Sequence, residues 1–255
     1  MHPAERTEIA AWADMAAAVP PDFYELYRLE ARFENGLFTM TSRGLHLAHF
    51  NAANTDPWTP EVLDAALETF RRAGSSKFYV HMMPEEGALA AARGLRRVSA
   101  WDRIVRPATA GEPAHAECLG VERVTSATAS EWAGFIDSVY HLPAAPWLIA
   151  FAERNGWHHF ALREAGAIVA ARSMFIDGEQ RAWWGIDAPV PGIMTDRFDR
   201  DFALCAAMLD AGWVEGAREF VSWIEKPNPS RTGPAYEGFA KLGFEVPYLR
   251  ENWMP

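Results

Sequence analysis

The spacing of apolar residues predicts alternating strands and amphipathic helices in the first half of the chain. Predicted strands cover 37–41, 45–51, 77–82 and 95–105, and predicted helices cover 60–73 and 85–92. Thr59-Pro60 is a typical beginning for the first helix, and Gly74 is a typical end. Ahead of that helix, we expect this half to keep only the strands over 37–41 and 45–51.

The second half repeats the order strand, helix, strand, helix, strand. Its predicted elements are strand 181–187, helix 196–211, strand 219–224, helix 234–241 and strand 244–250. The long helix of each half ends in Ala-Gly, at Gly74 and at Gly212, and the last turn carries Gly94 or Gly243. A duplicated supersecondary unit explains this repetition better than chance does.

The second half also contains predicted elements ahead of the repeated unit. These are a strand over 120–124, a helix with Trp132 and Ile136 on one face, a helix from Trp147, and strands over 158–163 and 168–176. The last two strands are predicted to form a hairpin joined by Glu164-Ala165-Gly166.

A connector separates the two halves. Between Pro107 and Gly120 the run Pro-Ala-Thr-Ala-Gly-Glu-Pro interrupts the apolar periodicity. We therefore predict an N-terminal domain over 1–106, a linker over 107–119 and a C-terminal domain over 120–255.

Composition narrows the class of protein. The chain has 255 residues, 49% of them hydrophobic, and a formal net charge of −10, which is the wrong sign for nucleic acid or an anionic membrane as partner. No signal-type block opens the sequence, and no apolar stretch is long enough to span a bilayer. Cys118 and Cys205 are too few for a disulfide framework, so a reducing, cytoplasmic location is expected.

The histidines do not predict a metal site. His158 and His159 are neighbours on a predicted strand, so their side chains point to opposite faces. His46 and His49 are three apart, which again separates their faces in a strand. We predict no metal.

The element order of the second half resembles a domain of the GNAT (N-acetyltransferase) superfamily. The closing stretch Tyr236-Glu237-Gly238-Phe239-Ala240-Lys241-Leu242-Gly243-Phe244 is similar to the last helix and Gly-Phe turn of that superfamily. The phrases Phe50-Asn51-Ala52-Ala53 and Tyr248-Leu249-Arg250-Glu251-Asn252-Trp253 resemble those of tandem GNAT proteins. The resemblance implies an α/β (α+β) fold of two tandem domains, each a mixed, mostly antiparallel sheet flanked by helices. It also implies a structural first copy and an active site in the second.

The resemblance implies acyl transfer from acetyl-CoA or another acyl-CoA in a slot between 183–187 and 220–225. By this resemblance Glu225 is the candidate general base, although a solvated strand-end glutamate is an equally simple reading. Asp187 would orient the acceptor amine. Tyr236 would lie near the position of the tyrosine that many GNAT enzymes use, which is Phe239 here, unless Tyr236 only packs in the core.

One feature of the superfamily is missing: the glycine loop that binds the CoA pyrophosphate at a helix N-terminus. The matching stretch has no glycine after Gly192 and is rich in aspartate. A capped helix without ligand explains it as well as binding does. If acyl-CoA binds, the candidate contacts are Ile186, Gly192, Thr195, Arg197, Arg200 and Asn228.

The candidate residues of the acceptor site are Tyr140, His141, Trp147 and Trp184. They come from the connection between the opening helices of the second half and from the slot strand. The leading hypothesis is an N-acyltransferase acting on a small amine. The alternatives are a catalytically degenerate GNAT protein that binds a ligand or protein, and a GNAT-fold enzyme using a different donor.

Overall fold

The computed structural model describes residues 1–45, 47–114, 120–189, 198–225 and 227–255, and the side chains of 189 and 198–201 are not described. The chain forms two compact units. Unit 1 comprises Met1–Arg103, Trp223–Pro227 and Val246–Pro255. Unit 2 comprises Ile104–Ser222 and Asn228–Glu245.

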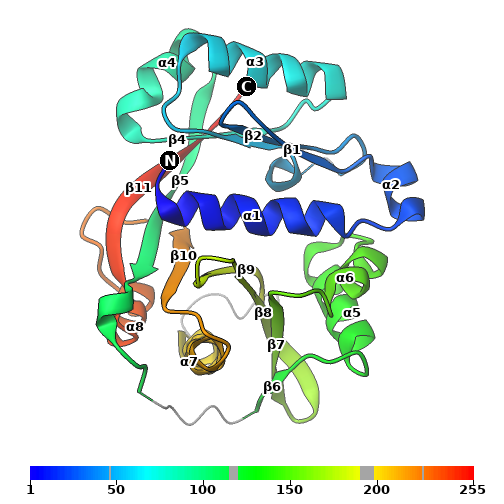
Figure 1. The fold of residues 1–255 in the computed structure, drawn as a ribbon, viewed down its shortest axis with the longest axis vertical. Coiled ribbons are helices and arrows are strands. Elements are labelled where there is room, and N and C mark those ends of the chain that lie inside the picture. Colours follow the sequence, from blue (N-terminus) through cyan, green and yellow to red (C-terminus); the bar gives the residue numbers. More distant parts are fainter. Residues whose placement is uncertain (46, 115–119, 190–197, 226) are drawn as a thin grey trace. The chain divides into compact units, whose positions relative to one another are not determined.

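Unit 1 is a sheet with helices on both faces. Its elements are α1 (Pro3–Ala17), α2 (Pro21–Tyr27), β1 (Glu30–Glu34), β2 (Leu37–Thr41), η1 (Ala48–Phe50), β3 (Ala52–Asn54), α3 (Pro60–Ala73), β4 (Tyr79–Met82), η2 (Pro84–Glu86), α4 (Gly87–Ala92), β5 (Arg96–Arg106) up to Arg103, and β11 (Glu245–Met254) from Val246. The strand order is β1-β2-β3-β4-β11-β5. The pair β3/β4 is parallel, and β1/β2, β2/β3 and β4/β11 are antiparallel. In Figure 1, α3 and α4 cover one face of this sheet and α1 covers the other.

Helix α3 shows how the sequence sets an element of unit 1. Thr59 Oγ1 accepts a hydrogen bond from Val62 N at 3.3 Å, and Gly74 ends the helix with a φ of 73°. Leu63 and Phe70 on its inner face are fully buried in a hydrophobic cluster. The predicted boundaries of this helix are confirmed.

The C-terminal strand belongs to the sheet of unit 1. β11 pairs antiparallel with β4, and the register places Glu251, Asn252 and Trp253 opposite Met82, His81 and Val80. Residues from the end of the chain therefore complete a sheet that is otherwise built from its first half.

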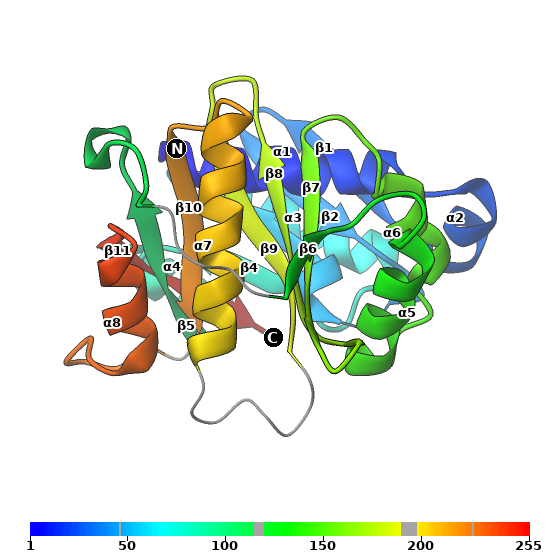
Figure 2. The ribbon, with the colours of Figure 1, turned by 90° about the horizontal axis from the view of Figure 1, so that it is seen from below.

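Unit 2 also contains strands with helices on both faces. Its elements are η3 (Ala108–Ala110), β6 (Val121–Arg123), α5 (Ala129–Tyr140), α6 (Ala145–Phe151), β7 (Trp157–Glu164), β8 (Ala167–Ile176), β9 (Arg181–Pro189), α7 (Phe198–Val214), β10 (Glu219–Glu225) up to Ser222, and α8 (Pro234–Lys241). The strand order is β10-β9-β8-β7-β6, and β9/β10 is the parallel pair. Figures 1 and 2 show α7 on one face of this sheet and α5 and α6 on the other.

The predicted hairpin of β7 and β8 is confirmed. Its turn places Ala165 and Gly166 at φ values of 50° and 85°. Two left-handed residues in succession are the signature of the tight hairpin turn that matches the twist of the strands.

The predicted α/β class, with mixed and mostly antiparallel sheets flanked by helices, is confirmed. Two predictions for the first half are wrong. The described residues of 45–51 form no strand; they contain η1, and the side chain of Asn51 holds the segment in its irregular path. Asn51 Oδ1 accepts from Ser42 N at 2.8 Å, and its Nδ2 donates to Leu45 O at 3.0 Å.

The second wrong prediction concerns the start of the chain. The first half was expected to lack opening helices, yet α1, α2 and β1 precede β2. The apolar pattern of α1 is obscured because its buried face carries Glu5 and Glu8, which are 3% and 4% exposed. Charged residues at such positions ordinarily indicate a surface.

Candidate functional site

Unit 2 contains an irregularity in β9 at the place where the sequence predicts a substrate slot. The ladder between β8 and β9 pairs Ala171 with Ala188 and Ser173 with Gly185. Arg172 of β8 therefore faces two residues of β9, Ile186 and Asp187, which is the arrangement of a β-bulge. A bulge takes one residue out of the regular ladder and redirects its backbone.

The backbone at the bulge is unusual for its residue type. Ile186 has a φ of 52°, in the left-handed region that a β-branched side chain rarely adopts. A conformation of this kind costs on the order of 1–3 kcal/mol and persists only where the surroundings enforce it. The fold therefore maintains the bulge against a local preference for extended backbone.

Two polar side chains hold Asp187 of the bulge. Arg172 Nη2 lies 2.6 Å from Asp187 Oδ2, and Arg172 Nη1 donates to Cys205 Sγ of α7 at 2.8 Å. The hydroxyl of Tyr140, at the end of α5, donates to the carbonyl oxygen of Asp187. The structure thus brings together two residues that sequence analysis proposed for the site, Tyr140 and Asp187.

A glycine next to the bulge makes room for a buried indole. A Cβ atom on Gly185 would lie 2.0 Å from Cη2 of Trp183, a separation that side chains do not tolerate. Trp183 is fully buried. Gly185 therefore allows the ring to fold over the strand immediately before Ile186.

The parallel pairing between β9 and β10 covers only a short part of each strand. Glu219–Val221 pair with Arg181–Trp183, and Ser222 Oγ then lies 3.5 Å from Trp184 O, at the limit of a hydrogen bond. Both strands continue beyond these pairs, β9 to Pro189 and β10 to Glu225. The bulge lies in this continuing part of β9.

The other proposed acceptor-site residues occupy different environments. His141 is exposed and ends α5 in the left-handed conformation, with a φ of 53°. Trp147 is buried, and its ring lies 5.9 Å from that of Phe151. Trp184 is also buried and packs 5.1 Å from the Phe244 ring. Trp147 and Trp184 have the environment of core residues.

The remaining proposed residues are distributed over both units. Glu225 is an exposed residue of unit 1 at the end of β10, and Tyr236 is a buried residue of α8 in unit 2. Asn228 organises its own loop: Nδ2 donates to Thr232 O at 2.8 Å, and Oδ1 accepts from Thr232 N.

The proposed pyrophosphate contacts fall largely on parts of the chain without a described structure. Gly192, Thr195 and Arg197 lie outside the described residues, and Arg200 lies in the first turn of α7 with an undescribed side chain.

Arg172, which pairs with Asp187 at the bulge, was not predicted from the sequence. The sequence contained a signal, because an arginine interrupts a mostly apolar strand, and in the structure this arginine is only 7% exposed. A buried arginine needs an acidic or accepting partner, and that requirement points to the strand beside it.

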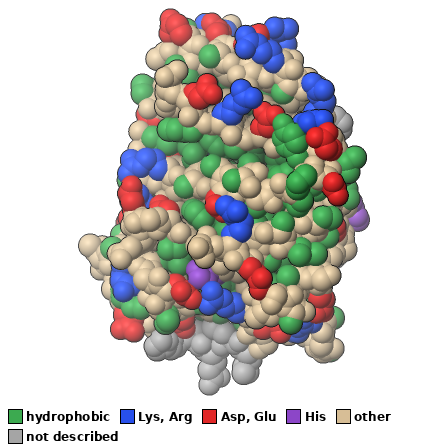
Figure 3. Space-filling view, turned by 45° about the vertical axis from the view of Figure 1, so that its right-hand side comes forward, with side chains coloured by type: hydrophobic (Ala, Val, Ile, Leu, Met, Phe, Trp, Pro, Cys, Tyr) green, Lys and Arg blue, Asp and Glu red, His purple; other side chains and the backbone are tan. Residues whose placement is uncertain are grey.

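The described part of the chain has neither a cluster of metal-ligating residues nor a helix suited to span a membrane. No group of three or more His, Cys, Asp or Glu residues there could hold a metal ion. No helix in it combines the length and the apolar character that crossing a bilayer requires. On the face in Figure 3, acidic and basic side chains are interspersed and do not gather by sign.

Comparison with solved structures identifies the fold. No family model and no curated protein matches the chain. A GCN5-related N-acetyltransferase from Kribbella flavida is similar over 94% of each chain, with a TM-score of 0.61 and 18% identity. One from Sphaerobacter thermophilus has a TM-score of 0.61 and 12% identity over 98% of this chain and 91% of its own.

A tandem GNAT protein from the clavulanic acid biosynthesis pathway is similar as well. It covers 98% of this chain and 94% of its own, with a TM-score of 0.51 and 17% identity. The chain therefore has the GNAT fold, and the predicted resemblance to tandem GNAT proteins is confirmed.

Proposed function

We propose that the protein transfers an acyl group from acyl-CoA, or from a related pantetheine thioester, to the nitrogen of a small amine. The observation that carries the proposal is the bulge at Ile186 and Asp187 in β9, beside the short parallel pair with β10. Residues with strained backbone occur most often at functional sites, where the strain orients a backbone group that would otherwise be paired within the sheet.

The proposed reaction needs polarisation of a carbonyl and removal of a proton. The amine nitrogen forms a bond to the thioester carbonyl carbon, and the C–S bond breaks with its electron pair going to sulfur. A base takes the nitrogen-bound proton, and one proton is returned to the thiolate, which leaves as the thiol. A backbone N–H at the bulge supports the oxygen that becomes negative in the transition state. Arg172 and Tyr140 hold this backbone through the carboxylate and the carbonyl of Asp187.

The roles of the other residues in this proposal follow the sequence hypotheses. Glu225 is the proposed base, and Asp187 is better suited to orienting the amine because its carboxylate already pairs with Arg172. Ile186 and Asn228 are proposed to contact the thioester-bearing donor. Its pyrophosphate is assigned to Gly192, Thr195, Arg197 and Arg200.

Thermal unfolding with acetyl-CoA tests binding first. A ligand at about 100 times its dissociation constant stabilises a protein by about 2.7 kcal/mol, which corresponds to a rise in Tm of several degrees for a chain of this size. A saturable rise supports the proposal. A Tm that stays the same at all acetyl-CoA concentrations contradicts binding of this donor. The enzyme would then have to use a different donor.

A release assay for the free thiol, run with a panel of small amines, tests the chemistry. Glu225→Gln is expected to lower kcat by about 10²-fold or more and to change its pH dependence. Glu237→Gln, at an exposed position of α8, is the matched control and should leave kcat unchanged. Acetyl-CoA binding without turnover of any amine would instead favour a catalytically degenerate binding protein.

A further inference from the structure

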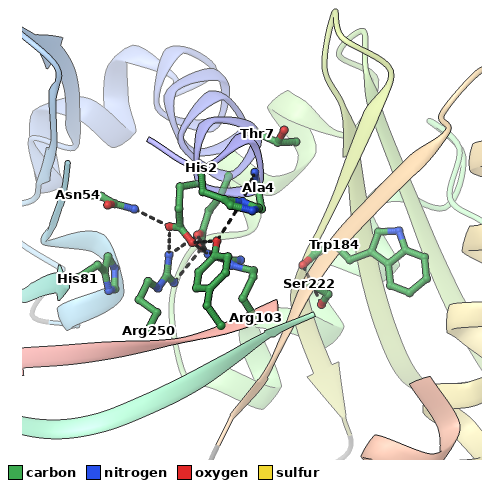
Figure 4. Close-up of polar contacts among 12 residues, drawn as sticks. His2, Ala4, Thr7, Asn54, His81, Arg103, Trp184, Ser222 and Arg250 are labelled. Atoms are coloured by element: carbon green, nitrogen blue, oxygen red, sulfur yellow. Dashed lines mark hydrogen bonds and ion pairs between the residues drawn. The ribbon is translucent and has the colours of Figure 1, made fainter. Parts of the chain in front are cut away.

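Unit 1 contains two groups of arginines that differ in how their charge is balanced. In the buried group, Arg103 donates to Glu5 Oε1 at 2.7 Å, and Arg250 donates to Glu5 Oε2 at 2.6 Å (Figure 4). Glu8 accepts hydrogen bonds from both arginines as well. Two guanidinium groups and two carboxylates leave this buried group without net charge.

The second group of arginines surrounds a hollow at the β1 edge of the sheet, beside the last turn of α3. The hollow has a volume of about 330 Å³ for the centres of water molecules. Its charged lining residues are Arg28, Arg32, Arg43, Arg72 and Glu30, and we refer to it as the arginine hollow. Four cations and one anion give it an excess of positive charge, although the whole chain has a formal net charge of −10. The arginine hollow therefore attracts anions.

Polar side chains occupy the face of the β1/β2 hairpin that lines the arginine hollow. Glu30 of β1 is opposite Thr41 of β2, and two residues along, Arg32 is opposite Thr39. Cross-strand pairs two residues apart lie on the same face of a sheet. The last turn of α3 adds Arg72. These side chains do not pack closely as the apolar cluster under the rest of α3 does, so the hollow remains between helix and hairpin.

Thr39 is a buried polar residue in the wall of the arginine hollow. It is 6% exposed, and its side chain makes no hydrogen bond with another described residue. A hydroxyl group both donates and accepts, and burying it without a partner is unfavourable. An oxygen atom of a molecule bound in the hollow would give the Thr39 hydroxyl a partner.

Tyr24 organises two of the charged residues. Its hydroxyl donates to Glu30 Oε1 at 2.7 Å, and the guanidinium carbon of Arg28 lies 5.0 Å from the centre of its ring. Arg32 Nη2 donates to Glu30 Oε2 at 2.9 Å. The hydrogen bond from Tyr24 is the main cause that lowers the pKa of the Glu30 carboxyl. The acidic residue of the arginine hollow thus already has a donor on each oxygen.

Arg43 is the arginine of this group whose charge is least balanced. Its side chain is exposed and makes no ion pair with another described residue. Each of the other three arginines has a solvent-exposed ion pair, with Glu25, Glu30 or Glu68. Exposed pairs contribute little to stability, and each guanidinium has five N–H donors. The group therefore keeps donors for an incoming anion.

A phosphate monoester suits these donors better than a carboxylate does. It carries close to two negative charges at neutral pH and has three terminal oxygens. Arginine binds phosphate oxygens through pairs of N–H groups. The arginine hollow is also larger than an isolated phosphate ion, so an organic group can accompany the phosphate.

We propose that the arginine hollow of unit 1 binds the phosphate group of a small phosphate monoester. The hydroxyl of Thr39 and the guanidinium of Arg43 bind phosphate oxygens, and the other three arginines balance the remaining charge. This site goes beyond the proposed acyl transfer and takes no part in it, so its test does not depend on that activity.

Two-dimensional NMR of the backbone amides, with glycerol 3-phosphate added in a phosphate-free buffer, tests the proposal. Saturable shifts are expected for the amide signals of Thr39, Thr41 and Arg43. The absence of saturable shifts at these three residues, or larger shifts in other parts of the chain, would overturn the proposal.

Single substitutions test the two proposed contacts. Arg43→Gln should weaken binding of glycerol 3-phosphate at least about tenfold, because a hydrogen bond to a charged group is lost. Thr39→Val keeps the shape of the side chain and should weaken binding by about threefold or more. Neither substitution leaves a described carboxylate without its partner, so both proteins should keep the parent Tm to within a few degrees.

The matched control is Arg96→Gln, which makes the same change of charge at an exposed position of β5 outside the arginine hollow. It should leave the affinity for glycerol 3-phosphate unchanged. Equal losses of affinity for Arg43→Gln and Arg96→Gln would show that only the general charge of the surface attracts the anion, and would refute the site.

Comparison of anions tests the chemical class of the ligand. Inorganic phosphate should bind no more tightly than glycerol 3-phosphate. Acetate, with one charge and two oxygens, should bind at least about tenfold more weakly at the same ionic strength. Equal affinity for acetate would contradict recognition of a phosphate group. Binding of inorganic phosphate without binding of glycerol 3-phosphate would overturn the assignment to a monoester.

Discussion

The guanidinium of Arg172 and the carboxylate of Asp187 form an ion pair of unequal burial. Nη2 and Oδ2 are 2.6 Å apart, and the side chains are 9% and 44% exposed. Loss of the arginine would leave a carboxylate that water can solvate. Loss of the aspartate would leave a buried cation.

Substitution of Asp187 should therefore lower the free energy of unfolding more than substitution of Arg172. We expect Asp187→Ala to lower the free energy of unfolding by about 2–3 kcal/mol, and Arg172→Met by only about 1 kcal/mol, because an uncompensated buried charge is the larger penalty. Denaturant unfolding measures both. Glu68→Ala, which removes exposed pairs on α3, should lower the free energy of unfolding by clearly less than Asp187→Ala does. Equal losses of unfolding free energy for Asp187→Ala and Arg172→Met would show that the unequal burial of the two side chains has no effect on stability.

A substitution in the hairpin turn of unit 2 should make the fold more stable. Ala165 occupies the first of two left-handed positions, with a φ of 50°, where asparagine is favoured over alanine. Ala165→Asn should raise the free energy of unfolding by about 0.5–1 kcal/mol, and Gly166→Ala should lower it by a similar amount. Urea unfolding of the two variants would reveal whether they shift in opposite directions. Shifts of the same sign would argue against this turn geometry.

Buried histidines make the fold sensitive to acid. Burial lowers the pKa of His159 to about 3 from an ordinary value of 6.5. Between these values the unfolded chain binds more protons than the folded one, so the free energy of unfolding falls as pH drops below 6.5 and keeps falling toward 3. For one such group, the loss between pH 7 and pH 5 is about 2 kcal/mol.

His159→Gln should flatten this dependence, and His81 contributes in the same direction. The measurement is denaturant unfolding at pH 7 and pH 5. The drop for the parent protein should exceed that of His159→Gln by about 1–2 kcal/mol. Identical drops would mean that His159 is not neutral and buried in solution.

Glu5 belongs to a buried charge cluster of unit 1 that contains Arg103 and Arg250. We expect its substitution to lower the free energy of unfolding strongly. Glu5 accepts from Arg103, Arg250, Tyr248 and Asn54. Glu5→Gln keeps the size of the side chain but leaves two buried cations with one carboxylate. The expected loss is about 3–5 kcal/mol.

The matched control for this prediction is Glu25→Gln, which weakens an exposed pair with Arg28 in the same unit and should cost under about 1 kcal/mol. Calorimetric unfolding compares the two variants. A loss at Glu5 as small as that at Glu25 would mean that the cluster is hydrated.

Local signals in the sequence determined most of the fold. Thr59, Gly74 and the Ala165-Gly166 turn act within a few residues of themselves, so capping and turn rules found the elements they bound. The strand expected over 45–51 failed because Asn51 bonds to Ser42 and Ser75, contacts that are set by tertiary structure.

Contacts between residues far apart in the sequence also could not be predicted at the candidate sites. Glu5 and Glu8 look like surface residues until Arg103 and Arg250 are known to lie beside them. The bulge at Ile186 has no local marker, because isoleucine ordinarily indicates a regular strand. Tyr140 and Asp187 were proposed because the resemblance pointed to them, and their contact is a product of the tertiary fold.

The pairing of β11 with β4 has a consequence for synthesis of the chain. A ribosome makes β4 before β11, with most of unit 2 emerging between them. During that interval one edge of β4 awaits its partner, and the nascent first half is an unfinished sheet with an open backbone edge. Synthesis of β11 thus completes the sheet of unit 1, and translation that stops before Glu251 should yield a product that chaperones and proteases recognise.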